Sequence, residues 1–253
     1  MKKKYYHEES IFLPENLLRE SRRQNNLNEC PVPKVCILDP DGDIIRYLKM
    51  KGAKLNSCWA CYHSELYSSA YKDLTFGIIG CSVGAAYAVL LAEQLFVSGC
   101  ELLISVMSAG KLNEEITKDY ILIDDTLRDE GTSYHYLPAD EKSSIDSHVS
   151  QMLEPLVNNK QLSVQKGKSW TTDAPYRETK SAIHDAKING ADCVEMEASA
   201  LYAFGKRKGK QVVCFAHLTN SMAQQYGDFE KGAENGSLTS LELIYQTAKL
   251  ISQ

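Results

Sequence analysis

The sequence has no long hydrophobic run and no strong excess of positive charge. None of its apolar segments reaches the roughly 20 residues that a membrane-spanning helix needs, and residues 1–9 are polar, unlike a signal peptide. The 253-residue chain carries a net charge of −5, so nothing indicates a nucleic-acid surface. We therefore expect a cytoplasmic protein that binds neither membranes nor nucleic acids.

The sequence also lacks a second pair of cysteines that could complete a zinc site. Cys58-Trp59-Ala60-Cys61 is a CxxC motif, but no other cysteines follow at a compatible spacing. In a reducing compartment, cysteines within apolar segments are small buried hydrophobic residues. Most of the eight cysteines have this setting, among them Cys36, Cys81, Cys100, Cys193 and Cys214. We expect no metal site and no redox role.

The residues that are present are typical of one globular α/β domain. Hydrophobic residues make up 43% of the chain, which is enough for a large core. Nearly continuous apolar runs are typical of buried strands, and we expect strands at 34–38, 75–81, 101–107, 120–124 and 211–218. Helices are expected at 14–23, 44–50, 87–97, 142–158, 198–208 and 238–251. We interpret 1–253 as a single domain with an N-terminal extension at 1–32 and a polar loop at 221–236.

Two carboxylates flank a methionine at the point where a short apolar run becomes a helix. Glu195-Met196-Glu197 stands there, and Gly209 follows the helix as its expected end. Acidic residues at a helix N-terminus interact favourably with the helix dipole whatever the function of the protein. A carboxylate held there is also well placed to accept hydrogen bonds from two sugar hydroxyls. The residues alone leave both interpretations open.

The same stretch resembles a known family. Val194-Glu195-Met196-Glu197-Ala198, followed by Ala200-Leu201, is similar to the sugar-binding signature of the nucleoside phosphorylase superfamily. That superfamily includes uridine phosphorylases, hexameric purine nucleoside phosphorylases and methylthioadenosine nucleosidases, and its motifs follow in order over 34–220. The resemblance implies a three-layer α/β/α sandwich with a mixed, partly barrel-like central sheet. It further implies a homo-oligomer, from dimer to hexamer, that acts on a small nucleoside without a cofactor.

The resemblance places the sugar site on the central motif. Glu197 would bind the ribose 2′- and 3′-hydroxyls, Met196 would pack on the sugar, and Glu195 would belong to the same ribose-binding site. Ser108 matches a family residue that contacts sugar and phosphate. His7 is the candidate for a histidine that reaches into the site of a neighbouring subunit.

A phosphate site is also implied, with inorganic phosphate as a possible co-substrate. A glycine-containing turn between a strand and a helix offers free N–H groups to an anion, and Gly80 and Gly84 lie in such a turn. Ser108 would contribute here too. Arg128 could supply positive charge from a direction that is new for the family. The implied reaction is phosphorolysis, which yields a free base and a sugar 1-phosphate.

The base would be bound by a later segment of the chain. Asp173 and Tyr176 match the family's pocket, and Arg177 resembles an arginine that reads a pyrimidine carbonyl. Trp170 could stack on the base, although it could equally be a core residue. Asn220 takes the place of the catalytic aspartate of purine enzymes; its amide can donate a hydrogen bond but cannot transfer a proton.

The sequence departs from the family where phosphate should be held. Leu38, Gly42 and Ser105 stand where relatives have a glycine and two arginines, and an arginine provides a charged, two-pronged donor that serine cannot replace. A hydrolytic nucleosidase is therefore the first alternative, with Asp41 or Asp43 as the general base that activates water. The second alternative is a non-catalytic nucleoside-binding protein.

Overall fold

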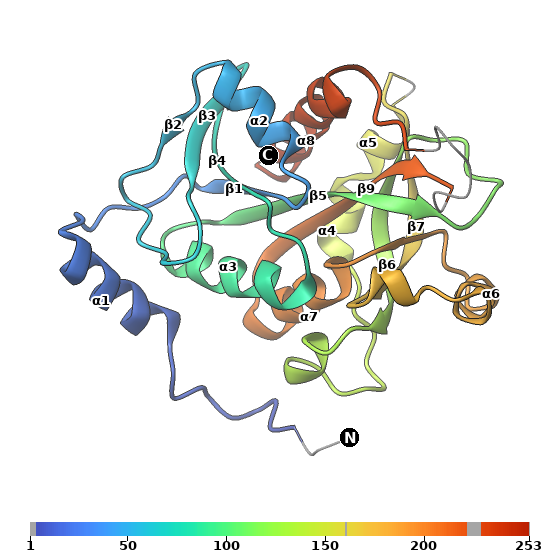
Figure 1. Ribbon diagram of the computed structural model, residues 1–253, viewed down its shortest axis with the longest axis horizontal. Helices are drawn as coiled ribbons and strands as arrows, with labels where there is room; N and C mark the ends of the chain where they lie inside the picture. The colour runs from blue at the N-terminus through green and yellow to red at the C-terminus, as the bar shows by residue number, and fades with distance from the viewer. Residues whose placement is uncertain (1–3, 160, 222–228, 253) are drawn as a thin grey trace.

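The computed structural model describes residues 4–159, 161–221 and 229–252. At its centre lies a nine-stranded mixed sheet with the strand order β2-β3-β4-β1-β5-β8-β7-β6-β9 (Figure 1). The strands are β1 (Val35–Asp39), β2 (Lys54–Leu55), β3 (Tyr67–Tyr71), β4 (Leu74–Gly80), β5 (Leu102–Lys111), β6 (Tyr120–Asp129), β7 (Val164–Thr172), β8 (Cys193–Glu195) and β9 (Gln211–Asn220). The expected strands therefore form, and three of them, β5, β6 and β9, continue at least two residues beyond the C-terminal bound that hydrophobicity alone indicates.

Half of this sheet closes into a barrel. β9 pairs with β6 on one side and with β5 on the other, so β5, β8, β7, β6 and β9 form a ring. Closure requires strands to bend, and irregular register provides the bend. Such shifts occur at Ala109/Gly110 between β5 and β9, and at Ile123/Asp125 between β6 and β7. The predicted partly barrel-like sheet is confirmed.

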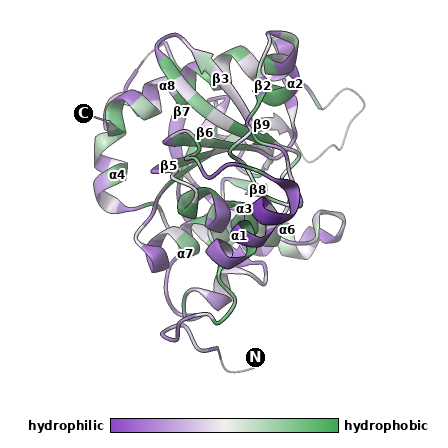
Figure 2. Cartoon of the chain, turned by 90° about the vertical axis from the view of Figure 1, so that its left-hand side faces the viewer, coloured by the Kyte–Doolittle hydropathy of each residue, from purple (hydrophilic) through white to green (hydrophobic). Residues whose placement is uncertain are grey.

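Helices cover both faces of the sheet (Figure 1). On one face α3 (Ala85–Val97) packs against α7 (Ala198–Lys208), and α1 (Pro14–Asn25) packs on α3. On the other face α2 (Asp43–Met50) packs against α8 (Ser237–Ile251). Figure 2 shows α1 as mainly hydrophilic on its outer side, whereas α3, on which α1 packs, is mainly hydrophobic. These layers match the predicted three-layer sandwich.

One expected helix is wrong, and one helix is missed. Residues 142–158 do not form a continuous helix: α4 (Ser147–Met152) begins only after Asp146, whose side chain caps it, and α5 (Glu154–Val157) follows as a separate turn. Pro155 cannot donate a backbone hydrogen bond and its ring disfavours a continuing helix, which explains the break. α6 (Lys180–Ile188) was not expected, because it buries little beyond Ala186.

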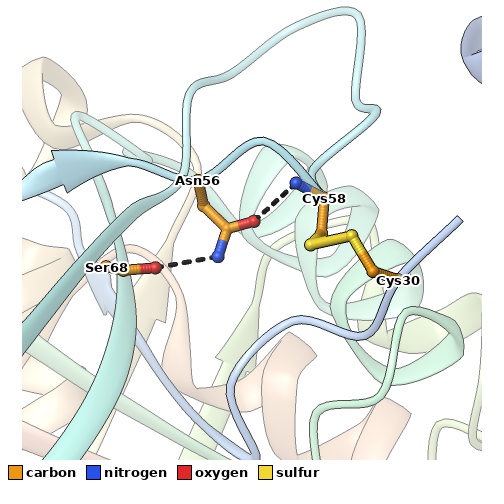
Figure 3. Close-up of a disulfide and its surroundings, with 4 residues drawn as sticks. All are labelled: Cys30, Asn56, Cys58 and Ser68. Carbon is orange, nitrogen blue, oxygen red and sulfur yellow. Dashed lines mark hydrogen bonds between the residues drawn. A yellow bond between two sulfur atoms is a disulfide. The ribbon is translucent and has the colours of Figure 1, made fainter. Parts of the chain in front are cut away.

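The expectation of buried cysteines is wrong for one member of the expected set, Cys81, and two cysteines outside that set form a disulfide that was not expected. Cys30 and Cys58 form a disulfide that joins the N-terminal extension to the loop after β2 (Figure 3). Asn56 holds that loop, since it accepts a hydrogen bond from the Cys58 N–H at 2.9 Å and donates one to the Ser68 hydroxyl at 2.8 Å. Cys81 is exposed at the end of β4. The other members of the expected set are buried, namely Cys36, Cys100, Cys193 and Cys214.

The polar loop expected at 221–236 is described only in part, because residues 222–228 lie outside the described ranges. Within those ranges, no helix has both the length and the apolar character that crossing a membrane would require.

Candidate functional site

Glu195 organises the start of α7. Its Oε2 accepts hydrogen bonds from the N–H groups of Glu197 at 2.6 Å and Ala198 at 2.7 Å. Its Oε1 accepts from the hydroxyls of Ser169 at 2.9 Å and Thr171 at 2.5 Å. Burial raises the pKa of Glu195, and these donors oppose that rise. Both carboxylate oxygens are used inside the protein, so Glu195 fixes the turn that presents Glu197, and its predicted contact with a sugar stays a prediction.

Glu197 is the N-cap residue of α7 and is only 2% exposed. Its Oε1 accepts a hydrogen bond from the Gly84 N–H at 2.5 Å, and the backbone N–H of Met196 also interacts with the carboxylate and opposes the rise of its pKa. Burial, followed by the neighbouring charge of Glu195, raises the pKa of Glu197 to about 8. Met196 is half-buried beside it. The structure therefore holds one carboxylate at a helix start with half of its hydrogen-bonding capacity unused.

The two glycines of the predicted phosphate turn have different roles. Gly84 precedes α3 with φ +98°, a conformation that L side chains rarely adopt, and its N–H contacts Glu197 rather than open solvent. Gly80 ends β4, where an added Cβ would lie 2.3 Å from the Ile45 Cγ2. Packing against α2 is thus sufficient to explain Gly80, whereas Gly84 belongs to the site around Glu197.

The loop after β1 brings Asp41 to the end of β5. The Ser108 N–H donates to the Asp41 Oδ2 at 3.0 Å, and the Lys231 ammonium lies 3.3 Å from the same oxygen. Asp41 also raises the pKa of Glu197, so its charge acts on the sugar-binding candidate. A small cavity is lined by Asp41, Ser108, His217 and Asn235, among others. Four sequence-predicted residues are therefore brought together: Asp41, Asp43 and Ser108 line the cavity, and Glu197 feels the charge of Asp41.

Asp43 is bound more tightly than Asp41. It accepts from the Lys231 ammonium at 2.6 Å, from Arg46 at 2.5 Å and from the Asn235 amide at 3.2 Å. Burial alone would raise the pKa of Asp43, but the hydrogen bonds from Lys231 and Arg46 outweigh it and lower the pKa. A carboxylate stabilised in its charged form is a weak base. Asp41 is the better candidate for activating water.

The end of β9 contributes His217 and Asn220. The His217 ring stacks on Tyr120 at a centroid distance of 4.4 Å, and burial, followed by the charge of Lys231, lowers its pKa. Asn220 is half-buried opposite Gly110 of β5, and its amide donates to the Thr219 hydroxyl at 3.3 Å. An imidazole with a lowered pKa and an amide thus lie at the end of β9, where the sequence predicts the residue that assists the departing base.

The segment expected to bind the base is only partly arranged as a pocket. Trp170 is 5% exposed, packs in a core cluster with Leu112 and Val194, and donates to Asp129 at 3.0 Å. The alternative that Trp170 is a core residue is therefore the one that the structure supports. Tyr176 is fully exposed, as is most of Arg177. Asp173, also exposed, accepts from the Gly131 N–H at 2.8 Å and so ties this segment to the loop after β6.

Residues 47–248 match the model of the Phosphorylase superfamily. The chain belongs to this superfamily. An uncharacterized protein of Acanthamoeba polyphaga mimivirus is 32% identical over 143 residues, which are 56% of this chain; the match spans about half, 55%, of that relative. A DeoD-type purine nucleoside phosphorylase of Clostridium novyi (strain NT) is 24% identical over 186 residues, 72% of this chain and 80% of that protein. The crystal structure of uridine phosphorylase from Vibrio fischeri ES114 is similar with a TM-score of 0.72 and 21% identity, covering 91% of this chain and 95% of that one.

Membership of the phosphorylase superfamily raises the question of where cations for phosphate would come from. Arg128 is engaged by the protein itself: its guanidinium donates to the Ser133 hydroxyl and to the carbonyls of Leu137, Pro138 and Glu141, at 2.5 to 3.0 Å. These contacts hold the loop after β6 and use four of the five guanidinium N–H groups, so they weigh against the predicted phosphate role of Arg128, which stays a prediction. His7 is exposed, and its predicted reach into a neighbouring subunit stays a prediction.

Sequence reasoning missed Lys231 and His217. In this phosphorylase-superfamily chain, Lys231 lies in the segment before α8, 188 residues from Asp43. A single lysine in a polar segment carries no signal of such a contact, since only the tertiary fold brings the two segments together. His217 lies within a strand, where its neighbours suggest an ordinary buried residue.

Proposed function

We propose that this protein cleaves the N-glycosidic bond of a nucleoside. The observation that carries the proposal is Glu197, which is buried at the start of α7 with one oxygen bound to the Gly84 N–H and few other donors among the described residues. A carboxylate has room for several hydrogen bonds, and the hydroxyl groups of a ribose would use that remaining capacity. The purine and uridine phosphorylases that the chain resembles support a nucleoside as the substrate class.

The acidic residues around the candidate sugar site could stabilise the positive charge that develops on the sugar during this reaction. As the bond between C1′ and the base breaks, its electron pair moves to the base and positive charge develops on the sugar. The carboxylate of Asp41, and that of Glu197 when it is ionised, would stabilise that positive charge, and such preorganised electrostatics is usually the largest catalytic contribution. Asn220 would donate a hydrogen bond to the base, which takes its proton from solvent because an amide cannot transfer one.

The acceptor at C1′ would be phosphate or water. The names of the relatives favour phosphate, with sugar 1-phosphate as product. One observation favours water: the Ser108 N–H, which by resemblance would face phosphate, donates to Asp41. In the hydrolytic case the oxygen of a water molecule would bond to C1′ while Asp41 accepts a proton from that water. The products would be the free base and the free sugar.

The decisive experiment is incubation with a panel of purine and pyrimidine nucleosides, with and without inorganic phosphate. Free base, sugar 1-phosphate and free sugar are quantified separately. Release of base from at least one nucleoside is the expected result. If calorimetry detects nucleoside binding while no base is released, the protein is a binder; if neither is found, the proposal is wrong.

A complete site would include a second copy of the chain. His7 lies in the N-terminal segment, which extends away from the domain body (Figure 1), and we infer that it contacts the neighbouring subunit's site. Light scattering should then show at least a dimer. A fully active monomer would contradict this part of the proposal.

A further inference from the structure

We propose that Asp41 selects the acceptor by occupying, with its own carboxylate, an anion-binding place formed by the Ser108 N–H and the Lys231 ammonium. The selection of an acceptor rests on the proposed function. The anion-binding place does not, because it can be tested without any nucleoside.

The Asp41 carboxylate occupies a position where two donors could bind an anion. The Asp41 Oδ2 receives the Ser108 N–H at 3.0 Å and lies 3.3 Å from the Lys231 Nζ. A backbone N–H and an ammonium that converge on one oxygen are the donors that a phosphate oxygen would use. Ser108 stands at the end of β5, while Lys231 comes from the segment before α8. The fold thus brings both donors to one point from distant parts of the chain.

The local charges explain why phosphate should be excluded while Asp41 is present. Asp39, at the end of β1, accepts backbone N–H groups from Gly42 and Ile45, whereas Asp41 and Asp43 bind the cations Lys231 and Arg46. Arg46 is bound to Asp43, and Lys231 is divided between Asp41 and Asp43. No net positive charge remains for a dianion. A phosphate would also meet the Asp41 carboxylate at close range, where like charges repel strongly.

Removal of the Asp41 carboxylate reverses this balance. The Ser108 N–H and part of the Lys231 charge would lose their partner, and Lys231 has a side chain that is only 13% exposed. Buried donors without acceptors are unfavourable. An anion from solution would restore both contacts. The structure therefore assigns Asp41 the role of a built-in anion that competes with phosphate.

The test measures binding of inorganic phosphate by isothermal titration calorimetry at pH 7.5. Asp41→Ala removes the carboxylate and opens space, whereas Asp41→Asn removes the charge at constant size. Asp185→Ala is the matched control, because Asp185 is an exposed residue of α6 far along the chain from this loop. Asp41→Ala combined with Lys231→Met tests whether the gain depends on the ammonium. Circular dichroism melts establish that each variant is folded.

We expect Asp41→Ala to bind phosphate at least about tenfold more tightly than the wild type. The Asp185→Ala control should match the wild type, and the double variant should lose the gain. The proposal is overturned if both Asp41 variants bind phosphate no better than the control, or if the gain persists without Lys231. Should Asp41→Ala fail to fold, Asp41→Asn decides. If phosphate binding appears as expected but no variant cleaves a nucleoside, the proposed function fails and the anion site stands.

Discussion

Replacing Glu197 by Gln should make the protein more stable at alkaline pH while it impairs function. Glutamine has the same shape, and its carbonyl oxygen can still accept from the Gly84 N–H that Glu197 contacts. What the change removes is the ionisation of a buried group whose pKa is raised from 4.5 to about 8, first by burial and then by the charge of Glu195. Ionisation of this group is therefore unfavourable in the folded protein and easy in the unfolded chain.

The sign of the effect follows from proton binding. Between pH 4.5 and about 8 the folded state keeps the Glu197 proton and the unfolded chain releases it. The contribution of Glu197 to stability is fully present below the lower pKa and is lost as the pH rises through the higher one. At about 1.4 kcal/mol for each tenfold change in proton affinity, the loss between pH 5 and pH 9 amounts to about 4 kcal/mol. Relaxation around a buried charge reduces such values, so about 2–4 kcal/mol is expected.

Urea unfolding at pH 5, 7 and 9 measures this directly. The difference in unfolding free energy between Glu197→Gln and wild type should move in favour of the variant by about 2–4 kcal/mol from pH 5 to pH 9. Glu115→Gln, at an exposed position, is the matched control and should follow the wild type. Parallel pH profiles for wild type and Glu197→Gln would refute the reasoning. On the proposed function, the same variant should lose about 2–4 kcal/mol of transition-state stabilisation in kcat/KM.

Three further predictions test other parts of the chain. Cys30→Ser, which breaks the disulfide to Cys58, should lower the unfolding free energy by about 2–4 kcal/mol in urea titrations without reductant; equal stability of oxidised and reduced wild type would contradict this. Arg128→Met should destabilise by about 2–4 kcal/mol and accelerate proteolysis of the loop after β6, without raising the KM for phosphate; a raised KM at unchanged stability would return Arg128 to the phosphate site. Tyr176→Ala, at a fully exposed ring, should change stability by less than about 0.5 kcal/mol but raise the nucleoside KM several-fold, and an unchanged KM would remove Tyr176 from the base site.

The elements that hydrophobic runs and glycine delimit could be predicted from the sequence. α7 has the expected bounds, because Gly209 adopts the left-handed conformation with φ +62° that ends it. The strand at β3 could not be predicted in the same way, since Tyr67–Tyr71 is half-exposed and contains two serines in five residues. Its stability comes from pairing along its whole length with β4. Contact with a neighbour, rather than its own composition, makes this segment a strand.

The sequence predicted which residues lie in the candidate site better than it predicted what each of them contacts. The motif places Glu195 and Glu197 two residues apart, yet one is bound by four protein donors and the other by two. Three of the donors that distinguish them come from elsewhere, namely Ser169 and Thr171 on β7 and Gly84 before α3. A local pattern carries no information about such partners. The same reasoning applies to Arg128, whose type suggested an anion site although its partners are backbone carbonyls.

The cost of burying carboxylates separates the structural ones from the functional ones. Glu130 is 3% exposed and accepts from the Ser199 hydroxyl and from the Thr132 and Ser133 N–H groups. Glu195 is equally buried and has four donors. In both cases the hydrogen bonds offset the loss of water. Glu197 is as deeply buried but has fewer donors, the N–H groups of Gly84 and Met196, and its pKa is raised to about 8. Because strongly perturbed pKa values cluster at functional sites, this difference indicates the binding site more strongly than the sequence motif does.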